Sequence, residues 1–186
     1  MRKAIVTTIM AGAVGVAAMA AGPIAAQADT TGSGPTTTTF SVSGGSLAIT
    51  APASANLGSA SIGATNVSGS LGTVTVADQR ASLSLASWTA SVTSSSFTTG
   101  QASSNETIPA TDVGYNPGTQ TAQSGIGVFA PGVLTALTNI ATAQTAYTAV
   151  AEVGATSVSW NPTITVTLPS SVVAGTYTGT ITHSVA

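Results

Sequence analysis

The sequence predicts an all-β protein, an antiparallel β-sandwich of the immunoglobulin-like, Greek-key type. Apolar and small polar residues alternate in many short stretches, which is the pattern of half-buried strands. Clusters of glycine, proline and asparagine separate these stretches and indicate turns. Of the 186 residues, 43% are hydrophobic but only 4% are aromatic. The core must therefore be built mainly from small and β-branched side chains, which favour strands.

The composition excludes several classes of protein. Only 4% of the residues are charged, with three Lys+Arg and five Asp+Glu. So few cations cannot neutralise a phosphate backbone, which excludes nucleic acid as a partner. The mean hydropathy of +0.43 excludes disorder of the highly charged kind. Because the chain has no cysteine, disulfides and thiolate metal sites are excluded as well.

Residues 1–28 form a segment of their own. A cationic start at Arg2 and Lys3 precedes an uncharged apolar run, and Ala26 and Ala28 give a small-x-small cleavage pattern. This order predicts a secretory signal peptide and is favoured over a membrane anchor, because the apolar run is short and rich in alanine. Residues 29–39 lack periodicity and are predicted to be a flexible leader. The domain proper is predicted to cover residues 40–186, with no membrane contact after cleavage.

The first half of this domain shows a succession of strand patterns. Residues 40–43 and 47–50 alternate on either side of Gly44-Gly45, which predicts a hairpin. Alternation returns in three further short stretches, and Asn116-Pro117-Gly118 predicts a turn. These three stretches are residues 71–76, 83–85 and 88–92.

The second half contains the one ambiguous segment, residues 133–153. Its alanine and leucine content is compatible with a short helix, but the regular threonines lose rotamer freedom in a helix. We predict a strand plus a loop there. Residues 163–168 alternate strictly, residues 169–175 are predicted to turn, and residues 177–185 alternate again. Seven or more short strands in this order indicate the sandwich.

Few side chains are candidates for a functional site. Asp78 and Arg80 lie two apart at a strand end and point to the same side. They are interpreted as a hydrogen-bonded ion pair tying the strand end to a loop, or alternatively as a pair that contacts a ligand. Trp88 and Trp160 are each expected to fill the core, although either could stack on a sugar ring.

His183 is the one histidine, and it shares a strand face with Tyr177. A packed position is favoured over a general base. A zinc site would need further His or Cys ligands, and no Asp-x-Asp loop suggests calcium. No metal and no cofactor are expected.

Several segments together resemble the WxL domains of Gram-positive surface proteins. Asp78-Gln-Arg80 followed by Trp88-Thr-Ala90 is similar to the distal motif, with Ala90 in place of leucine. Residues 108–116 are similar to the middle segment of the family. Residues 177–185 are similar to its C-terminal motif, with His183 in place of the second tryptophan and valine in place of leucine.

The resemblance implies a secreted, cell-wall-associated protein that attaches non-covalently to peptidoglycan through its β domain. The candidate ligand-binding residues are then Trp88, Trp160, Asp78, Arg80, Tyr177 and His183. The alternative is a structural surface or fibre protein that associates with itself, or with other surface proteins, through strand edges. An enzyme is not expected, because the scattered acids and the C-terminal histidine form no catalytic pattern.

Overall fold

The computed structural model describes residues 39–42, 44–133 and 135–186. Residues from Ser41 onward form one compact unit. Ten strands and two short 3-10 turns follow one another in this unit. In chain order they are β1 (Leu47–Thr50), β2 (Asn66–Ser70), β3 (Val74–Ser94), β4 (Phe97–Thr98), η1 (Ser104–Glu106), β5 (Thr107–Ile108), η2 (Ala110–Asp112), β6 (Val113–Asn116), β7 (Gln120–Pro131), β8 (Gln144–Trp160), β9 (Thr163–Thr167) and β10 (Ile181–Val185).

The strands form antiparallel sheets in the order β1-β3-β8-β7, with β10 also on β3, and β2-β9-β6, while β4 pairs with β5. The two larger sheets join end to end. The register of β3 on β8 begins at Val74↔Trp160, and that of β2 on β9 ends at Ser70↔Thr163. The ladder thus continues from β2 into β3 and from β8 into β9 after a short break.

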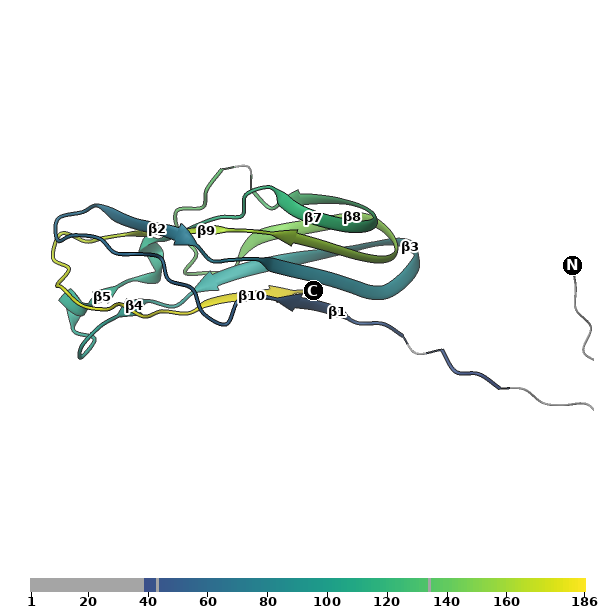
Figure 1. Ribbon diagram of the computed structural model, residues 1–186, viewed down its shortest axis with the longest axis horizontal. Coiled ribbons are helices and arrows are strands. Elements are labelled where there is room, and N and C mark those ends of the chain that lie inside the picture. Colours follow the sequence, from purple (N-terminus) through teal and green to yellow (C-terminus); the bar gives the residue numbers. More distant parts are fainter. Residues whose placement is uncertain (1–38, 43, 134) are drawn as a thin grey trace, which may run out of the picture. The chain divides into compact units, whose positions relative to one another are not determined.

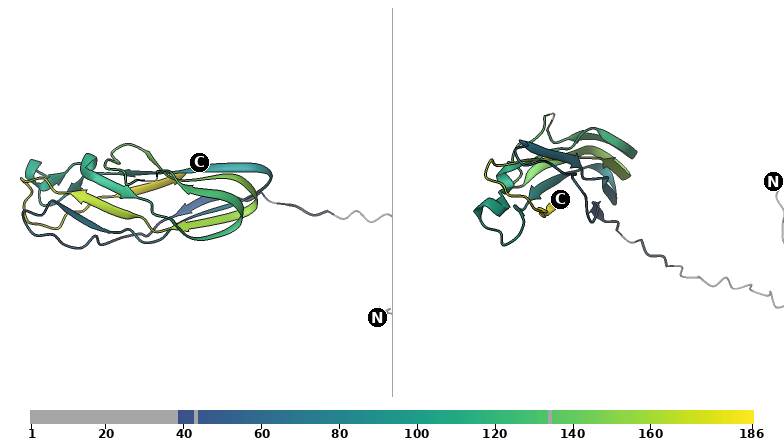
Figure 2. Two further views of the ribbon diagram at one scale, coloured as in Figure 1. Left: turned by 90° about the horizontal axis from the view of Figure 1, so that it is seen from above. Right: turned by 60° about the vertical axis from the view of Figure 1, so that its left-hand side comes forward.

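The long strands β3, β7 and β8 turn back together at one end of the fold (Figure 1). Each of them therefore contributes to two facing layers, which Figure 2 shows from above. We call this place the bend. Register shifts interrupt the β3·β8 ladder between Asp78 and Trp88. Ala151, Gly154 and Gly125 there have positive φ, the conformation that bulges and tight bends require.

The core lies between the two layers. One group of core side chains comes from β2, β9 and β6 and from the parts of β3 and β8 that lie next to them. The other group comes from the parts of β3 and β8 on the other side of the bend. The first group is Val74, Val76, Val113, Tyr115, Val158, Trp160, Ile164 and Val166, and the second is Trp88, Ala90, Val92, Ala146, Tyr147 and Ala149. These faces bury most of the large apolar side chains, and their burial is the main stabilising contribution.

The predicted all-β sandwich is confirmed, with two differences. Residues 71–92 do not form separate short strands, because β3 runs unbroken for 21 residues. The predicted hairpin through Gly44-Gly45 is wrong: β1 pairs with β3, and residues 39–42 form no strand. Phe40 and Val42 remain 88% and 84% exposed. Pairing of β1 with the central strand β3 is more favourable than the hairpin, because it packs Leu47 and Ile49 against the core.

The remaining predictions agree with the structure where it describes the chain, except that the alternation at 177–185 gives a shorter strand: β10 is Ile181–Val185, and residues 177–180 hold only the isolated bridge Thr98↔Thr178. The segment 133–153 is a loop followed by the first part of β8, with no α-helix in its described residues. Asn116 accepts a hydrogen bond from the Gly118 N–H at 3.0 Å, which closes the predicted turn. The signal peptide and almost all of the leader lie outside the described residues. Within the described ranges, no helix has the length and apolarity needed to cross a membrane.

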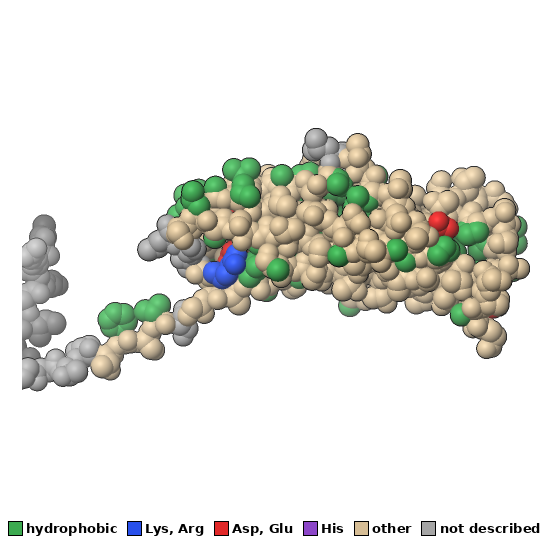
Figure 3. Space-filling view, turned by 180° about the vertical axis from the view of Figure 1, so that it is seen from behind, with side chains coloured by type: hydrophobic (Ala, Val, Ile, Leu, Met, Phe, Trp, Pro, Cys, Tyr) green, Lys and Arg blue, Asp and Glu red, His purple; other side chains and the backbone are tan. Residues whose placement is uncertain are grey.

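The surface of the domain carries little charge. Figure 3 shows one basic group at the bend and mostly neutral side chains around it. That group is Arg80, the one Lys or Arg among the described residues. Long-range attraction to an anionic partner therefore has little to act through.

Candidate functional site

A buried polar cluster fills the inner side of the bend. Asp78 is 2% exposed and accepts hydrogen bonds from Arg80, including one from Nη2 at 2.7 Å. Glu152, 1% exposed, accepts from the Trp88 indole Nε1 at 3.0 Å and from the Thr156 hydroxyl. Two carboxylates from the two long strands are thus held by donors that the bend brings to them. Such charge-assisted hydrogen bonds are stronger than neutral ones.

The structure contains the predicted Asp78–Arg80 ion pair, which links two parts of β3 and not a strand end and a loop. Arg80 donates through Nε to both carboxylate oxygens of Asp78 and through Nη2 to the Ser87 carbonyl at 3.1 Å. These hydrogen bonds keep the pKa of Asp78 below its usual value. The guanidinium therefore links the outgoing and returning parts of β3. Its side chain is still 39% exposed, so solvent screens the attraction.

The Trp88 indole belongs to this cluster and to the core. It is 3% exposed and lies 6.4 Å from Phe129, measured between ring centroids. An indole buried in this way has no free face on which a sugar could stack. The core interpretation of Trp88 is therefore the one that the structure supports.

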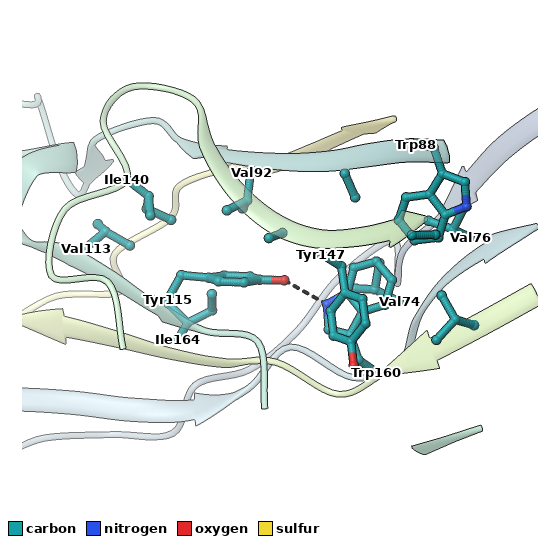
Figure 4. Close-up of a cluster of buried hydrophobic side chains, with 14 of the residues drawn as sticks. Val74, Val76, Trp88, Val92, Val113, Tyr115, Ile140, Tyr147, Trp160 and Ile164 are labelled. Carbon is teal, nitrogen blue, oxygen red and sulfur yellow. Dashed lines mark hydrogen bonds between the residues drawn. The ribbon is translucent and has the colours of Figure 1, made fainter. Parts of the chain in front are cut away.

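A second cluster joins the two layers nearer the middle of the domain (Figure 4). The Trp160 Nε1 donates to the Tyr115 hydroxyl at 2.9 Å, and that hydroxyl lies 3.1 Å from His183 Nε2. Tyr147 stacks on Trp160 with ring centroids 4.6 Å apart. Trp160 is completely buried. It too is a core residue, and burial raises the pKa of Tyr115.

His183 is half-buried at the edge of this second cluster. Since the Trp160 indole can only donate, the Tyr115 proton is free to point at His183 Nε2, which then accepts. The proton of the neutral ring is thereby assigned to Nδ1, which is buried without a hydrogen-bond partner among the described residues. Burial lowers the pKa of His183 to about 4. With both nitrogens occupied or covered, the ring is placed for packing rather than for proton transfer to a substrate.

Tyr177 lies apart from both clusters, in a surface groove at the other end of the domain from the bend. The groove has a volume of about 690 Å³ and runs between the coils 55–62 and 172–179. Buried Ile108 and Val166 line its inner wall. The aromatic rings of Tyr177 and Phe97 are half-buried in its sides. We call this the coil groove.

Neutral polar groups complete the coil groove. Hydroxyl-bearing residues of both coils, Ser59, Ser61, Thr176 and Thr178, stand beside Asn56 in its lining. Tyr177 Oη lies 3.0 Å from the Val173 carbonyl oxygen and 3.2 Å from that of Asn105, and the two carbonyls share its single proton. Its hydroxyl therefore fixes the 172–179 coil, while the ring remains part of the wall. An apolar floor with a few polar groups around it is the usual composition of a ligand site.

The six predicted site residues are thus divided among three places. Asp78, Arg80 and Trp88 meet at the bend, Trp160 and His183 meet through Tyr115, and Tyr177 stands in the coil groove. The sequence analysis missed Glu152, although an acid inside an otherwise apolar and alternating run is a signal of a buried partner. It also missed the role of Tyr115.

The described residues hold no group of three or more His, Cys, Asp or Glu side chains placed to bind a metal ion. No protein-family model matches the chain, and no curated protein or solved structure matches it.

Proposed function

We propose that this protein is a secreted, non-enzymatic surface module that attaches non-covalently to the cell wall, with peptidoglycan glycan as its ligand. The signal-peptide pattern and the resemblance to WxL domains support secretion and wall association. The coil groove is the observation that supports binding, because it combines two aromatic rings, an apolar floor and hydroxyl groups. Sugars are bound in proteins by this combination of ring stacking and neutral hydrogen bonds.

The same proposal assigns structural roles to the other predicted site residues. Trp88 and Trp160 are buried, and the Asp78–Arg80 pair ties β3 to itself. In this proposal they hold the two layers together, and the ligand meets the coil groove. Tyr177 is then the predicted site residue that contacts ligand, together with Phe97.

A pull-down with purified sacculi tests the proposal. The exported chain should sediment with the sacculi, and Ile62→Ser should weaken retention severalfold, because Ile62 is 75% exposed on the groove lining. Leu85→Ser is the matched control: its leucine is also 75% exposed, belongs to β3 at the bend and not to the groove lining, and retention should be unchanged. No soluble peptidoglycan fragments should be released. Absence of wild-type retention, or an equal loss in both variants, would refute the assignment.

A second candidate is a structural surface protein that associates with itself. One observation favours it: β7 ends the sheet order β1-β3-β8-β7 and carries exposed apolar side chains. An uncovered edge of this kind pairs readily with another strand. The two functions are compatible, since the coil groove and β7 belong to different parts of the domain.

A further inference from the structure

Among the described residues, most strand edges of this domain are either covered or short. The free side of β3 is taken by β1 along its first part and by β10 along its last part. Leu137 exchanges two backbone hydrogen bonds with Tyr115 of β6, and the remaining edge strands β1, β2 and β10 are only four or five residues long. Among the described residues β7 alone is a long strand with nothing along its outer side. Its unpaired N–H and C=O groups can accept a further strand.

The usual protection of such an edge is absent from β7. Its sequence QTAQSGIGVFAP holds no charged residue, and its proline stands at the last position. Natural edge strands are generally blocked by lysines, by prolines within the strand or by a covering segment. β7 is therefore open to pairing along most of its 12 residues.

The outer face of the sheet at the bend is also unusually apolar. Ile126 pairs with Val153 and Val128 pairs with Val150, so the four side chains stand together on one face. They are 68%, 37%, 60% and 50% exposed, respectively. On the same part of the molecule Leu85 is 75% exposed. An incoming strand on β7 would lay its own side chains beside Ile126 and Val128.

The chain itself contains a β-prone segment that belongs to no sheet. Thr39–Val42 directly precedes the domain, follows a run of threonines in the sequence, and has Phe40 and Val42 on one side of its alternating pattern. Both side chains are almost fully exposed, and the segment is not part of any sheet. A β-prone segment with two large, exposed apolar side chains is typical of a segment that pairs with a strand of another sheet.

We propose that Thr39–Val42, which extends the leader up to the domain and is counted with it from here on, adds as a strand to the β7 edge of a second copy and places Phe40 and Val42 against Ile126 and Val128. A second copy is the better source of this strand than the same chain. β1, which continues from the leader, and β7 lie on opposite edges of the sheet, with β3 and β8 between them. The leader of the same chain would have to cross a sheet face to reach its own β7.

This contact is heterologous, since a leader meets an edge rather than its own equivalent. A complex of two copies still has one free leader and one free β7, so the contact repeats and produces open chains unless it closes into a ring. Charge does not oppose it, because neither surface carries any. The inference does not depend on wall binding, and its readout is separate from sacculus retention.

Cysteine cross-linking tests the proposal directly, because the chain has no cysteine of its own. Three single variants of the exported chain are needed: Ser41→Cys in the leader, Ser124→Cys on β7, and Ser59→Cys at the coil groove as the matched control. All three serines are exposed. Mixed pairs are treated with a short bis-maleimide reagent. Leader plus β7 should give roughly tenfold more mixed dimer than leader plus groove.

The other outcomes overturn the proposal. A dominant leader-plus-groove product would mean that the leader occupies the coil groove. A dominant Ser124→Cys homodimer would mean that β7 pairs with β7. Equal yields for all pairs would mean random collision, and the same result is expected if the leader binds within its own chain, since mixed single variants report contacts between chains only.

A second measurement excludes misfolding as an explanation. The double variant Phe40→Ser/Val42→Ser should abolish concentration-dependent assembly in sedimentation velocity, with an unchanged melting temperature, because both residues lie outside the packed core. Val173→Ser is the control, since Val173 is 39% exposed but lines the coil groove. Assembly that persists in the double variant would refute the role of the leader.

Discussion

The buried polar residues of this domain are linked to its few aromatic ones. Glu152 accepts from the Trp88 indole, and the Tyr115 hydroxyl accepts from the Trp160 indole. An indole N–H buried without a partner would cost about 1–3 kcal/mol, so each tryptophan needs an acceptor at one defined place. The acceptors come from strands distant in sequence, and the hydrogen bonds therefore specify how the two layers face each other.

Replacing Glu152 tests its role as a hydrogen-bond acceptor. Glu152→Ala should lower the free energy of unfolding by roughly 3 kcal/mol, because the Trp88 and Thr156 donors both lose their acceptor. Glu152→Gln keeps an oxygen at that position and should cost about 1 kcal/mol or less. Urea unfolding followed by tryptophan fluorescence measures both. Equal losses would contradict the acceptor role assigned to Glu152.

His183 should make stability depend on pH. Burial lowers its pKa from 6.5 to about 4 in the folded protein, so between these values the unfolded chain binds a proton that the folded one does not. The free energy of unfolding should therefore decrease as the pH is lowered from 6.5 to about 4, by roughly 3 kcal/mol in total. His183→Gln, which keeps an acceptor for Tyr115, should flatten that part of the profile.

Asp78 contributes to the stability of the fold over a different pH range, and this difference serves as the internal control. Hydrogen bonds from Arg80 lower the pKa of Asp78 from 3.8, so its contribution is complete above that value and is lost only as the pH falls further. Unfolding midpoints measured from pH 7 to pH 3 therefore report both groups. If the pH dependence of stability above pH 4 were the same in His183→Gln as in the wild type, the assignment to His183 would be contradicted.

At the scale of the elements, the bend determines the architecture. β3, β7 and β8 turn together, and each carries an irregularity there: register shifts in β3, Gly125 in β7, and Ala151 and Gly154 in β8. Bulges bend a strand and increase its twist. Three adjacent strands bent in this way give one sheet two facing halves, and so a core with short connections.

Two glycines of the bend test this account. Gly125 has a φ of +82°, and a Cβ there would lie 2.5 Å from the Ala155 carbonyl oxygen. Gly154 has a φ of +76°, but a Cβ there meets nothing within 4 Å. Gly154→Ala should therefore cost only the unfavourable φ, about 1 kcal/mol. Gly125→Ala should cost ~2 kcal/mol more through the clash with the backbone.

Thermal unfolding of the two variants measures the difference. The far-ultraviolet circular dichroism of Gly154→Ala should match that of the wild type, which makes it the control for φ alone. Equal destabilisation of the two variants would mean that the bend can shift to accommodate a side chain at Gly125.

The bend also explains what the sequence could and could not predict. Alternation predicted the strands at residues 163–168 and 88–92 and the sandwich class. It divided β3 into three pieces because each register shift moves the alternation by one residue. The Asp78–Arg80 pair could be predicted from local spacing. The partner of Glu152 could not, because Glu152 meets Trp88 across 64 residues of sequence, and only the pairing of β3 with β8 brings the two together.

At the scale of the whole molecule, the lack of charge limits how this protein can bind. Arg80 is the one described cation, and it is paired with Asp78. The described surface has neutral hydroxyl and amide groups, the coil groove and the apolar face at the bend. Binding must therefore come from contacts of short range, whether the partner is a glycan or another copy of the chain.

Salt provides the corresponding test of wall attachment. Attraction between exposed charges is strongly weakened when the Debye length falls from about 10 Å at 0.1 M to about 3 Å at 1 M salt. Stacking on Tyr177 and Phe97 and neutral hydrogen bonds in the coil groove are barely screened. We therefore expect the exported chain to remain on sacculi washed with 1 M NaCl. A cationic protein of similar size is the control and should elute. Complete elution of this chain as well would assign its retention to charge, against the neutral groove as the binding site.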